Sequence, residues 1–114
     1  MRTNFKMENK NIVMTRGDTL SFGVEVTDID GNPMTFDSAF FTCKKSNTDV
    51  IPLFQKSLGN GVSKVGDDYV VRVAPEDTKY IEAGRYFYDF QVGVDQDIFT
   101  ILKGVIEIEQ DVTF

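Results

Sequence analysis

The chain has 114 residues, and its 12 basic and 18 acidic side chains give a formal net charge of −6. A charge of this sign disfavours nucleic-acid backbones and anionic membrane surfaces as partners, because phosphate binding requires a basic patch. There is no histidine and one cysteine, so the commonest general base and metal ligand is missing and no internal disulfide can form.

A chain of this length predicts one domain, large enough to bury a core without disulfides or metal. Cys43 lies in a phenylalanine-rich run and is expected to be a small buried hydrophobe. The polar N-terminal stretch lacks the apolar core of a signal peptide, and no run approaches the ~18 apolar residues of a membrane span. We therefore expect a protein made and kept in a cytoplasm, with no membrane contact and no cofactor.

The first third of the chain predicts an N-terminal arm and two strands. Residues 1–11 are expected to be a flexible arm, and residues 12–14 a short strand. Residues 15–18 form a turn, in which Gly17 tolerates positive φ. Residues 19–28 then alternate strictly, which is the mark of a strand with one buried face. The residues on that face are Leu20, Phe22, Val24 and Val26.

The middle of the chain predicts shorter strands separated by turns. Residues 28–33, DIDGNP, carry the strongest turn signal. Residues 36–45 form a strand with Ala39, Phe41 and Cys43 on one face. Residues 50–58 predict a weaker strand that Pro52 places at an edge or a bulge. Residues 59–61 are expected to close a hairpin onto a strand at 62–65.

The last part predicts the longest strands. After a strand at 69–74 and one helical turn at 75–80, residues 84–94 alternate, with Tyr86, Tyr88 and Phe90 on one face. The final strand covers 98–108, where Gly104 is expected to mark a bulge, and residues 110–114 are a tail. About eight strands without a helical period predict one β-sandwich or small barrel over residues 12–109.

Tyr86 is predicted to form a structural corner. Gly84 frees the backbone at the entrance of the strand, and Tyr86 then sits where the corner tyrosine of immunoglobulin-like sandwiches sits. Such a hydroxyl bonds backbone a few residues upstream, here expected between Asp77 and Tyr80. The alternative is a core aromatic without that bond, and both interpretations bury the ring.

Three patterns resemble functional sites but are better explained as turns. Asp28, Asp30 and Asn32 resemble the opening of a calcium loop, yet its twelfth position, which requires a carboxylate, is Ala39. Residues 16–18 spell the tripeptide that integrins recognise, and we interpret them as a turn. Acidic residues in surface turns are expected to be solvated, so no catalytic residue is predicted. Those considered for hydrolysis are Asp67, Asp68, Glu76 and Asp77.

The last two strands carry apolar residues on both faces. Phe87 points away from the Tyr86 face by alternation. A two-residue hairpin turn would place Phe99 and Ile101 inward, and a three-residue turn would place them outward. An apolar patch on a sheet marks an interface more often than an enzyme site, although a crossing segment of the same chain could cover it. The candidate interface residues are Phe5, Ile12, Phe87, Phe99 and Ile101.

A family resemblance is carried by short motifs in a fixed order. They are RGDT at 16–19, DGNP at 30–33, FFTCK at 40–44, PEDT at 75–78 and AGRYFYD at 83–89, followed by Thr100 and Gly104. With these motifs, residues 12–109 resemble the immunoglobulin-like domains of tailed-phage and prophage virion proteins. The N-terminal domain type of the baseplate upper protein is among them.

The resemblance implies an immunoglobulin-like antiparallel β-sandwich of about 7–8 strands without catalytic residues. It also implies a place in the virion, as a tail, baseplate or neck accessory. The expected partners are other virion proteins or further copies of the chain, which would make it a homo-oligomer. The alternative is a carbohydrate-binding or adhesive domain of a bacterial surface protein, in which Tyr80 and Asp77 would contact the sugar.

Overall fold

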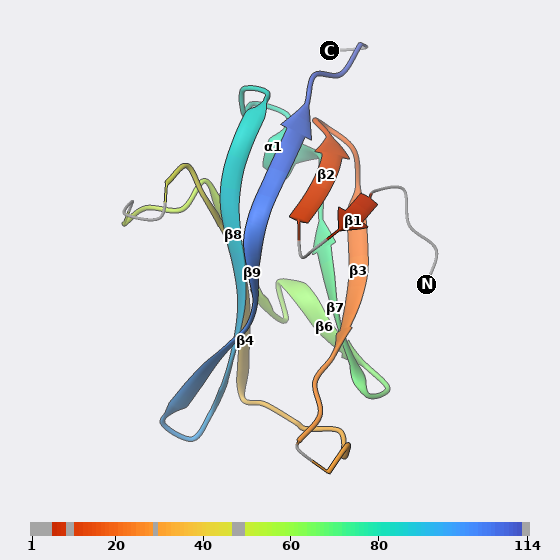
Figure 1. Cartoon of the computed structure of the whole chain (residues 1–114), viewed down its shortest axis with the longest axis vertical. Coiled ribbons are helices and arrows are strands. Elements are labelled where there is room, and N and C mark those ends of the chain that lie inside the picture. Colours follow the sequence, from red (N-terminus) through yellow and green to blue (C-terminus); the bar gives the residue numbers. More distant parts are fainter. Residues whose placement is uncertain (1–5, 9–10, 29, 47–49, 113–114) are drawn as a thin grey trace.

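The computed structural model describes residues 6–8, 11–28, 30–46 and 50–112 of the chain. These residues form nine β-strands and one short helix, and the strands join in a single hydrogen-bonded series (Figure 1). The elements are β1 (Lys6–Glu8), β2 (Asn11–Thr15), β3 (Leu20–Glu25), β4 (Ser38–Lys44), β5 (Phe54–Leu58), β6 (Gly61–Val65), β7 (Asp68–Val73), α1 (Pro75–Thr78), β8 (Gly84–Val94) and β9 (Asp97–Glu109).

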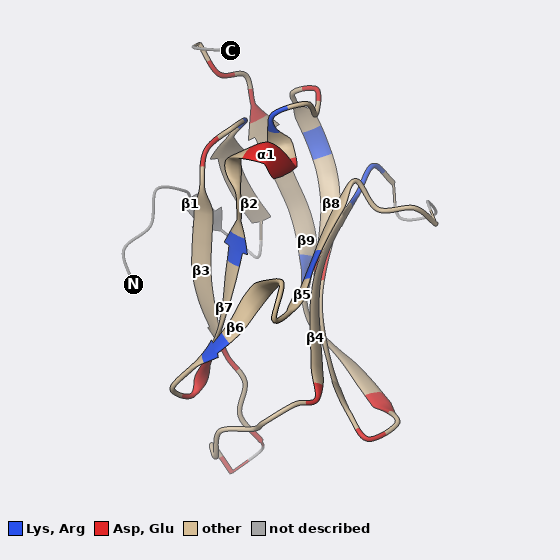
Figure 2. Ribbon diagram, turned by 180° about the vertical axis from the view of Figure 1, so that it is seen from behind, with Lys and Arg blue, Asp and Glu red and all other residues tan. Residues whose placement is uncertain are grey.

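The strand series runs in the order β1-β2-β9-β8-β4-β5-β6-β7-β3 and folds into two packed layers. Strands β2, β9, β8, β4 and β5 form the first layer, and β6, β7 and β3 form the second (Figures 1 and 2). Because β1 and β2 continue the first layer beyond β9 towards β3, the series nearly closes into a barrel.

This strand order is that of an immunoglobulin-like sandwich. Strands β3, β7 and β6 occupy the positions of B, E and D, and β4, β8 and β9 those of C, F and G. The all-β sandwich predicted from the sequence is therefore confirmed. The sheet is mixed, however, because the β2–β9 and β5–β6 pairs are parallel while the other pairs are antiparallel.

The passage from β5 to β6 is a tight corner and not the predicted hairpin. Gly59 and Gly61 have φ values of 89° and 98°. Between them the chain passes into the second layer, where β6 runs parallel to β5. A Cβ on Gly61 would lie 2.6 Å from the Cδ of Lys56, so the corner also needs the missing side chain.

The alternating apolar residues form one core between the layers. Phe41 lies at its centre, with its ring centroid 5.4 Å from Tyr88 and 5.6 Å from Phe22. Each fully buried side chain of this size stabilises the fold by about 1.5–3 kcal/mol. Cys43 is also fully buried, and this burial raises the pKa of its thiol to about 12, as expected for a packed hydrophobe. The inward faces predicted for residues 19–28, 36–45 and 84–94 are confirmed.

The Tyr86 corner is present, with a different partner. The Tyr86 hydroxyl donates a hydrogen bond to the backbone oxygen of Glu82 over 2.5 Å, closer in sequence than the predicted region. Asp77 instead accepts the N–H of Ala74 and forms an ion pair with the Nζ of Lys56, at 2.7 and 2.6 Å. Gly84, the first residue of β8, does not have a positive φ, so no left-handed conformation requires a glycine there.

Both ends of the domain are tied to the sandwich. Residues 6–8 of the predicted arm form β1, which pairs with β2. In the predicted tail, the Asp111 carboxylate is buried and accepts a hydrogen bond from the Nε of Arg16 over 2.8 Å. Gly17, with φ 83° as predicted, donates its N–H to the buried hydroxyl of Thr78 over 2.8 Å, which joins the β2–β3 turn to α1.

Candidate functional site

The turn at residues 28–33 uses the Asp28 carboxylate for its own backbone. Oδ1 of Asp28 accepts the N–H groups of Asp30 and Asn32 over 2.9 and 3.0 Å. The hydrogen bond from the Asn32 backbone contributes most to lowering the pKa of Asp28, and the bond from Asp30 adds to it. These contacts identify the DIDGNP segment as a self-capped turn, in agreement with the preferred interpretation.

The Arg-Gly-Asp tripeptide at residues 16–18 is also structural. The Arg16 guanidinium donates to Asp111 and, from Nη1, to the backbone oxygen of Ile81 over 3.3 Å. The Arg16 and Asp111 side chains are 18% and 6% exposed, so the guanidinium is committed to the fold.

Tyr80 and Asp77, which were expected to bind sugar together, make contacts with different residues. Tyr80 is 85% exposed and lies near the Nζ of its neighbour Lys79, at 5.7 Å from the ring centroid. Asp77 is engaged by Ala74 and Lys56, as described above. The carbohydrate alternative therefore lacks the free carboxylate on which it rested.

Strands β8 and β9 form a long hairpin whose free end projects beyond the neighbouring layer (Figure 1). Its turn has two residues, Asp95 and Gln96, and places Phe99 opposite Val92 on the inward face. This is the outcome expected for a two-residue turn. Phe99 is still 45% exposed, and Ile98, on the other face of the same projecting end, is 70% exposed.

A bulge in β9 sets the position of Ile101. Adjacent residues of β8 pair with Thr100 and Leu102, which leaves Ile101 as the extra residue of the ladder. The bulge therefore lies at Ile101, and the expectation of a bulge at Gly104 is wrong. Ile101 is partly buried and packs against the core.

The other candidate interface residues have different environments. Ile12 is fully buried, because β2 pairs with β9 and this side chain points into the core. The prediction that Ile12 is an interface residue is therefore wrong. Phe5 lies outside the described residues. Phe87 is partly exposed on the outer face of the first layer, as alternation predicted.

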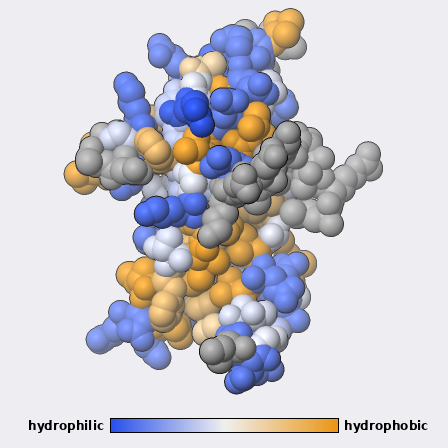
Figure 3. All heavy atoms as spheres, in the orientation of Figure 1, coloured by the Kyte–Doolittle hydropathy of each residue, from blue (hydrophilic) through white to orange (hydrophobic). Residues whose placement is uncertain are grey.

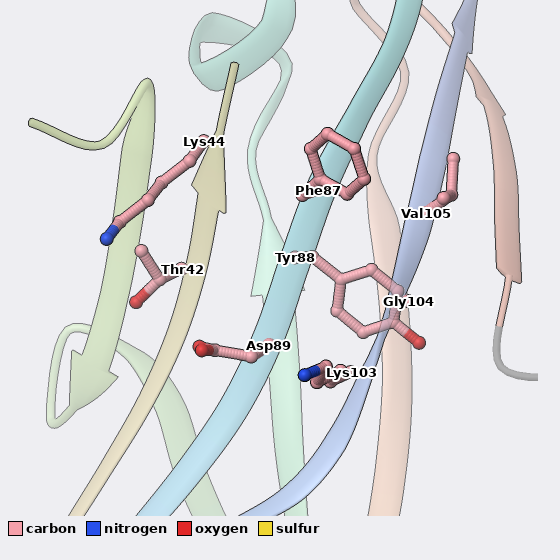
Figure 4. A pocket seen from close by; sticks show the side chains of 8 residues that line it. All are labelled: Thr42, Lys44, Phe87, Tyr88, Asp89, Lys103, Gly104 and Val105. Carbon is pink, nitrogen blue, oxygen red and sulfur yellow. The ribbon is translucent and has the colours of Figure 1, made fainter. Parts of the chain in front are cut away.

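Phe87 lies in an open hollow of about 540 Å³ on that outer face (Figure 4). Three neighbouring strands contribute to the hollow, which is within the size range of small-ligand or side-chain pockets. Phe87 pairs with Val105 on β9 and with Lys44 on β4, so apolar and charged groups adjoin. The lining residues are Thr42, Lys44, Phe87, Tyr88, Asp89, Lys103, Gly104 and Val105.

The charges of the hollow have both signs. Asp89 lies directly opposite Lys103 in the β8–β9 ladder, and a cross-strand pair of this kind contributes about 0.2–1 kcal/mol. Burial raises the pKa of the Asp89 carboxyl, and the ammonium groups of Lys44 and Lys103 partly offset this effect. The three side chains together carry one net positive charge in a chain whose net charge is −6.

Sequence reasoning missed this hollow because the β4 part of its lining lies more than 40 residues before the β8 part in the sequence. Alternation does place Thr42 and Lys44 on the face opposite Phe41, but it gives no lateral neighbours. The exposed side chains of Val50 and Ile51, 89% and 81% accessible in the β4–β5 connection, were also missed.

No protein-family model matches the chain, and no curated protein sequence is significantly similar to it. Within residues 6–8, 11–28, 30–46 and 50–112, no group of three or more Cys, Asp or Glu side chains could hold a metal ion. In the same ranges, no helix is long and apolar enough to cross a membrane.

Proposed function

We propose that the chain is a non-enzymatic structural module of a tailed-phage or prophage virion. It acts in the tail, baseplate or neck through contacts with other virion proteins or with further copies of itself. The observation that carries the proposal is the projecting β8–β9 hairpin, which presents Ile98 and Phe99 to solvent at 70% and 45% exposure.

The hairpin is a rigid support for such a contact. Strand β8 is hydrogen-bonded to β4 on one side and to β9 on the other, so the exposed apolar side chains stand on a central strand pair. Figure 3 shows apolar atoms gathered around the lower part of the molecule, where this hairpin projects. Contiguous apolar surface of this kind marks protein–protein contact sites.

The most engaged carboxylates support a scaffold. Asp77 caps α1 and pairs with Lys56, Asp111 pairs with Arg16, and Asp28 caps its own turn. Two of these carboxylates accept local backbone N–H groups, and the third forms an ion pair between distant parts of the chain, so all three stabilise the fold.

The test is the composition of particles from the source culture. Particles purified on a density gradient after phage induction are expected to contain the chain in a constant ratio to the major capsid protein, as measured by mass spectrometry. A chain that is abundant in the lysate and absent from the particles would contradict the proposal.

Variants encoded in the phage refine this test. Phe99→Ser is expected to reduce incorporation at least several-fold, because the docking residue is lost. Val65→Ser, at a 60% exposed position on the second layer, is the matched control and is expected to leave incorporation unchanged.

A further inference from the structure

We infer that the outer face of the β4–β8–β9 layer binds a second copy of the chain, with the hairpin tip of each copy seated in the hollow of the other. The inference rests on the proposed assembly role and names one of its partners. It is carried by the hollow around Phe87, by the exposed tip at Ile98, and by the charges at these two places.

The two places lie on one face of the same two strands. The strand register puts Phe87 and Val105 in one row of the outer face, and Gly93 with Ile98 in another row six residues further along β8. At about 3.3 Å per residue, the rows are about 20 Å apart. A twofold axis lying between the rows and perpendicular to the strands brings each tip opposite the other hollow.

The charges of the two places are complementary. The tip and the adjoining start of β4 carry Asp37, Asp95 and Asp97, and the Asp37 carboxylate accepts the N–H of Asp95 over 3.1 Å. Figure 2 shows acidic residues at the free end of the hairpin and basic residues higher on the same strands. The hollow presents Lys44 and Lys103 beside Asp89, so its net charge is positive. Opposite potentials therefore face each other at both contacts of the pair.

The apolar groups are complementary as well. Ile98 is a large aliphatic side chain that is exposed to solvent, and the apolar residues Phe87 and Val105 line the hollow. Burying an isoleucine in such a site stabilises association enough to change the dissociation constant about tenfold or more.

The outer face of the second layer lacks this pattern. Its strands present mainly small or polar side chains to solvent, and most of its partly exposed positions are charged or hydroxylated. These outward residues are Ser21, Gly23, Glu25, Ser63, Val65, Asp68, Val70 and Arg72. The contact is therefore assigned to the first layer, and the symmetry closes the assembly at two copies.

The primary test is the oligomeric state of the purified chain by sedimentation velocity over a concentration series. A dimer that dissociates on dilution is expected, and raised salt is expected to weaken it because the charge contacts are screened. Ile98→Ser is expected to weaken dimerisation about tenfold or more, and Val65→Ser is expected to leave it unchanged. A chain that is monomeric at every concentration, or an Ile98→Ser variant that dimerises normally, would overturn the inference.

A charge exchange gives a sharper second test. Lys103→Glu and Asp97→Lys are each expected to weaken the dimer, because like charges then face each other at both contacts. An equimolar mixture of the two variants restores opposite charges at both contacts, so heterodimers are expected to form. If Lys103→Glu lowers the melting temperature, Lys44→Glu takes its place in the mixture. Failure of the mixture to associate would exclude this arrangement.

These outcomes are separate from the test of the proposed function. A monomeric chain that is nevertheless present in purified particles would remove the twofold contact and leave the virion role intact. A dimer absent from particles would do the reverse.

Discussion

The Tyr86 hydroxyl joins the start of β8 to the segment that precedes it. Its bond to the Glu82 oxygen is 2.5 Å long, and the Tyr86 residue is 9% exposed. Tyr86→Phe removes the donor and leaves the carbonyl short of a partner. We expect this variant to lower the free energy of unfolding by about 0.5–1.5 kcal/mol in urea denaturation.

The control for this measurement is Tyr80→Phe. Tyr80 is 85% exposed, so its hydroxyl is solvated in both the folded and unfolded states, and we expect no change in stability. Equal effects of the two substitutions would show that the Tyr86 bond contributes nothing specific.

Asp28 gives the fold a pH dependence of known sign. Hydrogen bonds from the turn amides lower its pKa in the folded state, so its contribution to stability is present above the ordinary value of 3.8 and is lost as the pH falls through the lowered value. Asp28→Ala is expected to lower the melting temperature at neutral pH, and this difference should shrink in acid.

Asp30→Ala is the matched variant, since it keeps the backbone N–H that Asp28 accepts. Thermal melts of both variants across the acid range test the assignment. An Asp28→Ala effect that is constant with pH would mean that the ionised carboxylate is not its source.

At the scale of elements, the corner between β5 and β6 can be dissected with two glycines. Both have positive φ, but a Cβ on Gly61 would lie 2.6 Å from Lys56, whereas a Cβ on Gly59 would have no neighbour within 4 Å. Gly59→Ala is expected to cost about 1–2 kcal/mol from backbone strain alone. Gly61→Ala should cost more, and chemical denaturation measures the difference. Equal costs would mean that the Lys56 side chain moves aside freely.

The elements also show what a sequence can predict. Period-two alternation identified the inward faces of β3, β4 and β8, because one-sided burial leaves that pattern in any strand. The parallel β5–β6 corner was not predicted, since a glycine pair in a short turn is compatible with either strand direction. The bulge at Ile101 was also missed, because a bulge is defined by the partner strand and not by its own residues.

At the scale of the whole molecule, the sequence predicted some residues of the candidate contact surface and missed others. Phe87 and Phe99 were identified because large apolar residues on both faces of a strand exceed what one core can bury. The hollow with Lys44, Asp89 and Lys103 depends on three strands coming together, which local pattern does not reveal. Ile12 was misassigned because a short apolar strand next to a polar arm gives no sign of the pairing with β9 that buries it.

The parallel pairing of β2 with β9 has a consequence for how the molecule acquires its shape. Ile12 and Met14 meet their neighbours Ile106 and Ile108 only after the end of β9, more than 90 residues later in the chain, has been synthesised. Strand β2 can pair with β1 early, but its pairing with β9 must wait for the last strand, and such long-range closure folds on the slow, millisecond-to-second timescale of β-rich domains. Until β9 is available, Ile12 and Met14 lack these neighbours, which lengthens the time for which the partly folded chain exposes apolar surface.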